Sequence, residues 1–154
     1  MSACEVADVA HQVVTESRER AAAHEVALQL ESEEDEHAAY VDPVRLKRAL
    51  RNLVVNAIRY NRPGGSVRVL VRNETSTDEV GIEVRDDGPG MDARQVAGLF
   101  VPFDHHGRVA TQVPGRGLGL VVARLLVERM GGRISVDSQP GLGSRFTIHL
   151  PRVG

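Results

Sequence analysis

Residues 46–60 read LKRALRNLVVNAIRY, and residues 84–91 read VRDDGPGM. In the first stretch the apolar residues recur at the spacing of one helix face, namely Leu46, Leu50, Leu53, Val54, Ala57 and Ile58. Asp42 and Pro43 form a helix start, because Asp caps free amides and Pro tolerates the first turn. The Pro and Gly residues of 61–65 end the helix. The stretch therefore predicts one amphipathic helix that ends before Asn61.

The remaining chain alternates helical and strand patterns around this helix. Helices are predicted over 4–24, from Asp92 to Phe100, and over 118–130, and strands over 26–30, 67–72, 80–85, 133–137 and 145–150. The acidic run 31–40 and the Gly- and Pro-containing run 101–117 are expected to be loops. Because hairpins outnumber parallel crossovers, we expect one α/β domain over residues 1–154. Its architecture is a two-layer α/β sandwich, with a mixed, mostly antiparallel sheet and helices on one face.

Composition excludes several classes of protein. The chain has 154 residues and a formal net charge of −2, which gives no general attraction to nucleic acid or to an anionic membrane. Cys4 is the only cysteine, so an intramolecular disulfide is impossible. No run reaches the ~18–20 apolar residues of a membrane span, and the first residues lack the pattern of a signal peptide. We expect a cytoplasmic location, with anchoring of a longer natural protein left open.

The predicted helix 43–60 carries a second, polar line of residues. Asn52, Asn56 and Tyr60 are four residues apart, so they lie on one helix face. Asn is a poor helix former, and its amide oxygen is a legitimate Mg²⁺ ligand. Arg59 lies where it can reach a phosphate. Taken alone, this line also fits a polar helix edge that caps a neighbouring loop.

The turn 86–90 follows a predicted strand directly. A carboxylate such as Asp86, held at a strand end by a tight turn, suits a hydrogen bond from the exocyclic amine of a purine. Gly88 and Gly90 let the backbone approach a flat ligand closely. Taken alone, this turn also fits an ordinary surface turn.

A second glycine run, GRGLGL, occupies 115–120 and opens the predicted helix 118–130. Backbone amides at a helix start make an anion site that suits phosphates. The run lacks the spacing of a dinucleotide-binding fingerprint and the Lys-Ser/Thr ending of a P-loop.

The order of these motifs resembles the catalytic, ATP-binding domain of bacterial two-component sensor histidine kinases. The superfamily of that domain also holds DNA gyrase, the heat-shock chaperone ATPase and the mismatch-repair ATPase. LRNLVVNAIRYN resembles the N box, VRDDGPGM the first glycine box and LFVPFDHH the F box. GRGLGLVVARLLVERMGGRI resembles the second glycine box, and GLGSRFTIHLP the closing one. The resemblance covers about residues 4–152 and implies a Bergerat-type ATP-binding fold with a mobile lid at about 101–117.

The resemblance implies a role for each matching position. Asn56 would coordinate Mg²⁺ at the phosphates, with Asn52 one turn earlier on the same face. The other catalytic or nucleotide-binding positions are Arg59 on phosphate, Tyr60 beside the nucleoside, Asp86 on the adenine amine, Gly88, Gly90 and Met91 along the base, Gly115, Gly117, Leu118 and Gly119 in the phosphate loop, Thr147 at the pocket floor, and Arg108 and Arg116 as lid candidates for phosphate. The implied cofactors are ATP and Mg²⁺.

Asn52 is a departure from part of this superfamily that bears on the expected chemistry. The ATP-hydrolysing relatives carry a Glu there, and a carboxamide cannot act as that base. This favours transfer of the γ-phosphoryl group to a protein side chain over hydrolysis.

The expected partner is a separate helical dimerisation and phosphoacceptor domain, because none of the six His has the acceptor pattern His-Glu/Asp-x-x-x-Pro. A response regulator would follow it indirectly, and without that domain the chain is not expected to autophosphorylate. The alternatives are a serine-directed kinase of the anti-sigma-factor type and a non-catalytic nucleotide-binding module.

Overall fold

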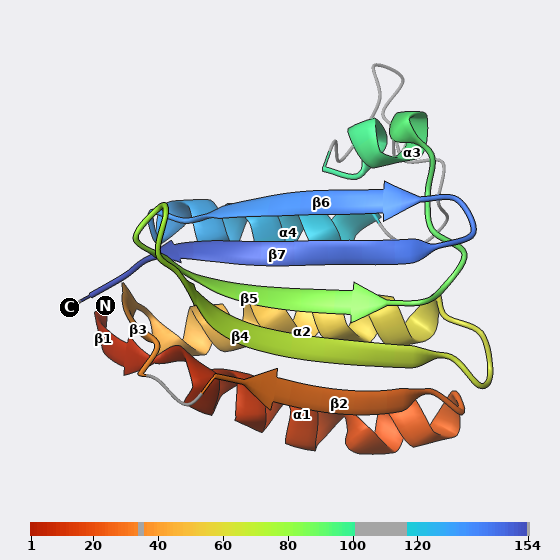
Figure 1. The fold of residues 1–154 in the computed structure, drawn as a ribbon, viewed down its shortest axis with the longest axis horizontal. Helices are drawn as coiled ribbons and strands as arrows, with labels where there is room; N and C mark the ends of the chain where they lie inside the picture. Colours follow the sequence, from red (N-terminus) through yellow and green to blue (C-terminus); the bar gives the residue numbers. More distant parts are fainter. Residues whose placement is uncertain (34–35, 101–116, 154) are drawn as a thin grey trace.

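The computed structural model describes residues 1–33, 36–100 and 117–153. The elements in chain order are β1 (Ser2–Glu5), α1 (Val6–Ala23), β2 (Ala27–Ser32), β3 (Ala38–Val41), α2 (Pro43–Arg59), β4 (Ser66–Glu74), β5 (Glu79–Asp86), α3 (Ala93–Gly98), α4 (Gly117–Arg129), β6 (Arg133–Gln139) and β7 (Gly143–Pro151). Figure 1 shows α1, α2 and α4 lying behind one sheet.

In the described part of the chain, the main sheet has five strands in the order β2-β4-β5-β7-β6. The pair β2–β4 is parallel, and the pairs β4–β5, β5–β7 and β6–β7 are antiparallel. One face of the sheet packs against the three long helices, and the other carries no helix among the described residues (Figure 1). The predicted two-layer sandwich with a mixed, mostly antiparallel sheet is therefore confirmed.

Helix α2 forms where the sequence predicts it. The Asp42 carboxylate accepts a hydrogen bond from the Val44 amide at 3.0 Å, which satisfies one of the unpaired donors at the helix start. The helix ends at its C-terminal cap, Tyr60. The apolar stripe of α2 is buried, whereas Val44, off the stripe, is 77% exposed. Full burial of each large apolar side chain contributes roughly 1.5–3 kcal/mol, so the stripe fixes which side of α2 meets the sheet.

The core lies between that stripe and alternate residues of the central strands. The inward residues of β4, β5 and β7 face one another across the register, as in Val69, Val84 and Phe146. All three are at most 2% exposed. Because side chains alternate along a strand, this register also fixes the face on which every polar residue of these strands lies.

The N-terminal region differs from the sequence prediction in two places. Residues 31–40 were expected to form a loop, yet β2 continues to Ser32, and β3 pairs antiparallel with β1. Helix α1 begins at Val6 rather than near residue 4, because the preceding residues belong to β1. Glu5 ends the strand and caps the helix, and its carboxylate also accepts from the His37 amide at 2.8 Å. The pairing of these two four-residue strands is long-range, so the local pattern does not show it.

Across the described ranges 1–33, 36–100 and 117–153, no helix has both the length and the apolar character required to cross a membrane.

Candidate functional site

Asp86 ends β5 on the side of the sheet that faces the helices. It shares that side with Val84, and its side chain is 8% exposed. One carboxylate oxygen, Oδ1, accepts a hydrogen bond from the Gly88 amide at 2.9 Å. This contact closes a tight turn immediately after the strand and fixes the orientation of the carboxylate.

The neighbouring Asp87 fastens this turn to the end of α2. Its Oδ1 accepts from the Ser66 amide at 2.8 Å and from the Asn61 side chain at 3.2 Å, and Arg62 lies 3.7 Å from its Oδ2. Partial burial acts to raise the pKa of Asp87, but the hydrogen bonds from Ser66 and Asn61 and the charge of Arg62 outweigh it. The pKa of Asp87 is therefore lowered.

The other end of the turn is fastened to the hairpin between β6 and β7. The Met91 amide donates to the Ser138 hydroxyl at 2.8 Å, and Ser138 meets the Ser144 hydroxyl at 2.7 Å. Gly90 has φ +69°, and a Cβ there would lie 1.9 Å from the Gln139 carbonyl oxygen. The hairpin contact alone thus requires glycine at this position, independently of any ligand.

Helix α2 reaches the second glycine run through Asn52. The Asn52 side-chain amide donates to the Gly119 carbonyl at 3.1 Å, across 67 positions of sequence. Gly119 lies in the first turn of α4, which begins at Gly117. Asn56 follows one turn along α2 and is 9% exposed. The N-terminal turn of α4 therefore lies against the asparagine face of α2.

The C-terminal end of α2 completes this arrangement. The Arg59 guanidinium lies over the Tyr60 ring, 5.7 Å from its centroid. A cavity of about 370 Å³ opens here, and its lining residues are Tyr60, Asn61, Arg62, Gly88, Pro89 and Gly141. Tyr60 and Gly88, predicted separately, thus border the same space.

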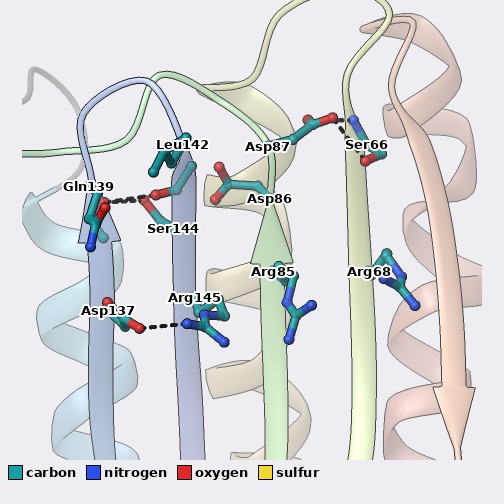
Figure 2. A pocket seen from close by; sticks show the side chains of 12 residues that line it. Ser66, Arg68, Arg85, Asp86, Asp87, Asp137, Gln139, Leu142, Ser144 and Arg145 are labelled. Atoms are coloured by element: carbon teal, nitrogen blue, oxygen red, sulfur yellow. Dashed lines mark hydrogen bonds and ion pairs between the residues drawn. The ribbon is translucent and has the colours of Figure 1, made fainter.

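A larger cavity of about 450 Å³ lies at the same end of the sheet (Figure 2). Asp86 and Ser144 lie at the strand ends, whereas Arg68, Arg85 and Arg145 extend along the strands. Those arginines alternate with the inward residues, so they belong to the face without helices. The cavity spans the rim of the sheet, and only its Asp86 end coincides with the predicted nucleotide site.

One predicted position is not brought to this site. Thr147 was expected at the pocket floor, but it pairs in register with Glu83 on the face without helices. Glu83 is ion-paired to Arg85 at 3.1 Å on that face. Side chains alternate along β7, so Ser144, opposite Asp86, is the residue that shares the Asp86 face. The pocket-floor role of Thr147 is corrected accordingly.

Other positions remain as predictions. Leu118 is 57% exposed at the start of α4. The lid was predicted over about 101–117, and its residues 101–116, with Arg108, Gly115 and Arg116, lie outside the described residues. Gly117, the last residue of the predicted lid, begins α4.

Two contacts that hold the turn in place escaped the sequence reasoning. Ser138 and Ser144 hold the Met91 end of the turn, and although Ser144 stands in the closing glycine box, neither residue was predicted to contact the turn. Asn61 and Asp87 were read as a helix stop and a turn residue, although together they tie α2 to β5. The strand parity of Phe146 is a sequence signal that would have favoured Ser144 over Thr147.

Comparison with known proteins bears directly on this geometry. Residues 41–154 match the family model of histidine kinase-, DNA gyrase B- and HSP90-like ATPases. The chain belongs to this family. The chain is 44% identical over 112 residues to the sensor protein GacS of Pseudomonas syringae pv. syringae, covering 71% of this chain and 12% of GacS. It is 34% identical over 151 residues to the alginate biosynthesis sensor protein KinB of Pseudomonas aeruginosa, covering 98% of this chain and 24% of KinB.

Solved structures give the same fold. The catalytic domain of the histidine kinase ThkA matches this ATPase-type domain with a TM-score of 0.83 at 23% identity, covering 98% of this chain and 95% of that one. Full-length ShkA in complex with AMPPNP matches with a TM-score of 0.84 at 24% identity, covering 99% of this chain and 31% of that one. The chain spans only about a tenth to a quarter of the length of the curated relatives GacS and KinB.

Proposed function

We propose that this domain binds Mg²⁺-ATP and donates the γ-phosphoryl group to a histidine on a helical phosphoacceptor domain. The observation that carries the proposal is the hydrogen bond between Asn52 and Gly119, at 3.1 Å. It joins the asparagine face of α2 to the N-terminal turn of α4, a natural site for phosphate. The same helix ends beside the turn that orients Asp86. The groups proposed for base recognition, metal ligation and phosphate binding therefore all lie on or beside α2.

The adenine end of the proposed site is formed by Asp86. A mostly buried carboxylate fixed by the Gly88 amide accepts the exocyclic amine of adenine and rejects a base without that donor. Gly88, Gly90 and Met91 line the same turn, and Tyr60 lies beside it. Ser144 replaces Thr147 as the β7 residue on this side.

The phosphate end is formed by α2 and α4. Asn56 would hold Mg²⁺ through its amide oxygen. This residue fits the ion by its donor type, since Mg²⁺ prefers oxygen and takes few protein ligands beside waters and phosphate oxygens. When bound, Mg²⁺ would neutralise charge on the transferring phosphate. Arg59 and the α4 amides at Gly117, Leu118 and Gly119 would bind phosphate oxygens. Gly115, Arg108 and Arg116 remain proposed phosphate ligands from the predicted lid.

The side-chain chemistry of Asn52 favours phosphoryl transfer over hydrolysis of ATP. Its amide group donates to a backbone carbonyl, and a carboxamide accepts no proton from water at neutral pH. The domain would thus contribute position and charge, and the acceptor histidine would be the nucleophile. A response regulator would then take the phosphoryl group from that histidine. Because ATP is the donor, we place this reaction in the cytoplasm.

The test supplies the domain with labelled ATP, Mg²⁺ and a separate dimeric helical hairpin that carries a His-Glu-x-x-x-Pro motif. We expect label on the hairpin that is lost in acid and retained in alkali, as for phosphohistidine, and no label on the domain alone. The control replaces the acceptor His of the hairpin by Gln.

Each alternative predicts another outcome. Acid-stable label on the partner would indicate the serine-directed kinase. Binding of ATP without transfer to the hairpin would indicate the non-catalytic module.

A further inference from the structure

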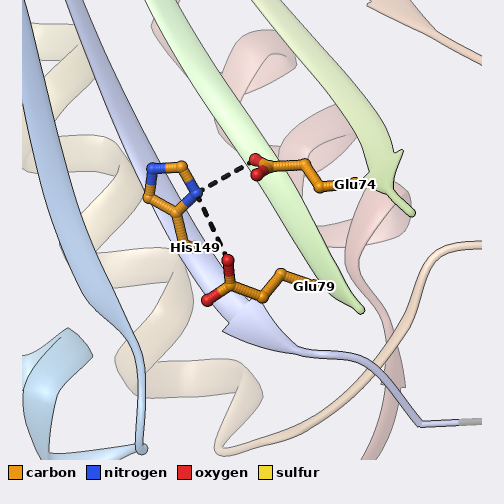
Figure 3. Close-up of side chains that lie close together, drawn as sticks. All are labelled: Glu74, Glu79 and His149. Carbon is orange, nitrogen blue, oxygen red and sulfur yellow. Dashed lines mark ion pairs between the residues drawn. The ribbon is translucent and has the colours of Figure 1, made fainter. Parts of the chain in front are cut away.

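Figure 3 shows three ligand-type side chains that meet on the sheet. They lie at the end of the sheet opposite Asp86. Glu74 ends β4, Glu79 begins β5, and His149 comes from β7. The imidazole Nδ1 lies 3.0 Å from Glu74 Oε1 and 4.0 Å from Glu79 Oε1. One ligand atom from each residue lies within 4.8 Å of the other two. The proposed nucleotide chemistry uses none of these residues.

The His149 ring is oriented toward the two carboxylates by a second contact. Its Nε2 lies 2.7 Å from the Ser135 hydroxyl, while the residue is 7% exposed. Its Nδ1 is buried and has no hydrogen-bond partner among the described residues, and the same holds for Glu74 Oε1. One ring nitrogen held by a hydroxyl and the other directed at carboxylates is the arrangement of a metal-binding histidine. His149 Nδ1 and Glu74 Oε1 lie 3.0 Å from each other without forming a hydrogen bond, and a cation bound to both would supply the partner that each lacks.

Gly81 makes space for the Glu74 carboxylate. It lies opposite His149 in the register of β5 and β7. A Cβ at this position would lie 2.2 Å from Glu74 Oε1. Glycine within a strand often marks a place where another group approaches the backbone closely. Here the approaching group is a carboxylate that reaches across β5 toward His149.

The charge of the cluster also suits a divalent cation. Glu79 is ion-paired to Arg133 at 3.0 Å. The Glu79 carboxylate thus already binds one positive charge, and a metal ion would compete with Arg133 for it.

We infer that Glu74, Glu79 and His149 bind a first-row divalent transition metal, for which Zn²⁺ is the best match. One imidazole nitrogen and two carboxylates suit Zn²⁺, whereas Mg²⁺ and Ca²⁺ prefer oxygen donors. Three protein ligands leave one coordination position for water or another ligand. Such an ion would link β4, β5 and β7 at the end of the sheet away from Asp86.

The test titrates ZnCl₂ into the nucleotide-free chain, because nucleotide phosphates chelate metal. We expect one Zn²⁺ per chain, and a melting temperature about 5–10 °C higher when free Zn²⁺ is 100 times its Kd. X-ray absorption of the bound Zn²⁺ is expected to show one imidazole nitrogen with oxygen neighbours. Glu74→Gln and Glu79→Gln keep the side-chain size and are expected to weaken binding by about tenfold or more.

Two further variants separate a metal site from a simple ion pair. Glu31→Gln removes a carboxylate paired with Arg68 on the same face of the sheet, and its Zn²⁺ affinity is expected to equal that of the original chain. Arg133→Met removes the cation that competes for Glu79 and is expected to tighten binding several-fold. The inference is overturned if Zn²⁺ neither binds nor raises the melting temperature, or if Glu74→Gln and Glu79→Gln leave its affinity unchanged.

Discussion

Asp86→Asn is the change that tests the proposed nucleotide site most directly. Asn has the size of Asp, and its oxygen can still accept the Gly88 amide hydrogen bond that closes the turn at 2.9 Å. The turn also keeps the hydrogen bonds made by Asp87 and Met91. The substitution therefore removes the negative charge and replaces one acceptor oxygen by an NH₂ donor, with little effect on the backbone.

The magnitude follows from the burial of the group. Asp86 is 8% exposed, so water cannot replace a lost partner easily. A hydrogen bond to a charged group is worth about 1.5–3 kcal/mol. Each 1.4 kcal/mol changes a dissociation constant tenfold. We expect Asp86→Asn to weaken Mg²⁺-ATP binding by about 10- to 150-fold.

The assay is titration calorimetry with ATP and with inosine triphosphate, which carries oxygen in place of the adenine amine. The original chain is expected to prefer ATP, and Asp86→Asn to lose this preference, because its amide can donate to the inosine oxygen. Asp87→Asn is the matched control, since Asp87 binds Ser66 and Asn61 rather than the base. Equal ATP affinity in the Asp86→Asn variant, or an unchanged ratio of ATP to inosine triphosphate affinity, would refute the reasoning.

Three further changes test the framework of the site. Asn52→Asp replaces the donor to the α4 carbonyl by a charged acceptor, and we expect a loss of about 1 kcal/mol in the free energy of unfolding, measured by urea denaturation. Asp87→Asn is expected to be less stable than the original chain at neutral pH, because hydrogen bonds lower the pKa of Asp87 in the folded state. That difference should disappear as the pH falls below the ordinary value of 3.8, and a difference that persists in acid would contradict this origin. Gly143→Ala is expected to lower the melting temperature more than Gly141→Ala, since both have positive φ but only the Gly143 Cβ would meet the Asp86 carbonyl, at 2.1 Å; equal losses would assign the effect to φ alone.

Local sequence patterns predicted most of the fold, because hydrophobic periodicity and helix capping depend on residues that are close in sequence. The apolar stripe of α2 and the alternation in β4 and β5 correspond to the faces that are buried. The capping residues Asp42 and Asp92 begin helices where they were expected to. The pairing of β1 with β3 was missed, since two strands of four residues carry little periodic signal and pair across more than thirty positions.

The candidate site likewise has features that the sequence predicted and features that depend on the tertiary structure. The sequence by itself determined the motif order, the asparagine face of α2 and the position of Asp86 at a strand end. Only the tertiary structure decided that Asn52 contacts Gly119, and that Ser144 pairs in register with Asp86.

The physical reason is that a strand places alternate residues on opposite faces, so a difference of one position reverses the assignment. Register depends on partners distant in sequence. The same holds for Glu74, Glu79 and His149, which no local pattern connects and which three strands bring together.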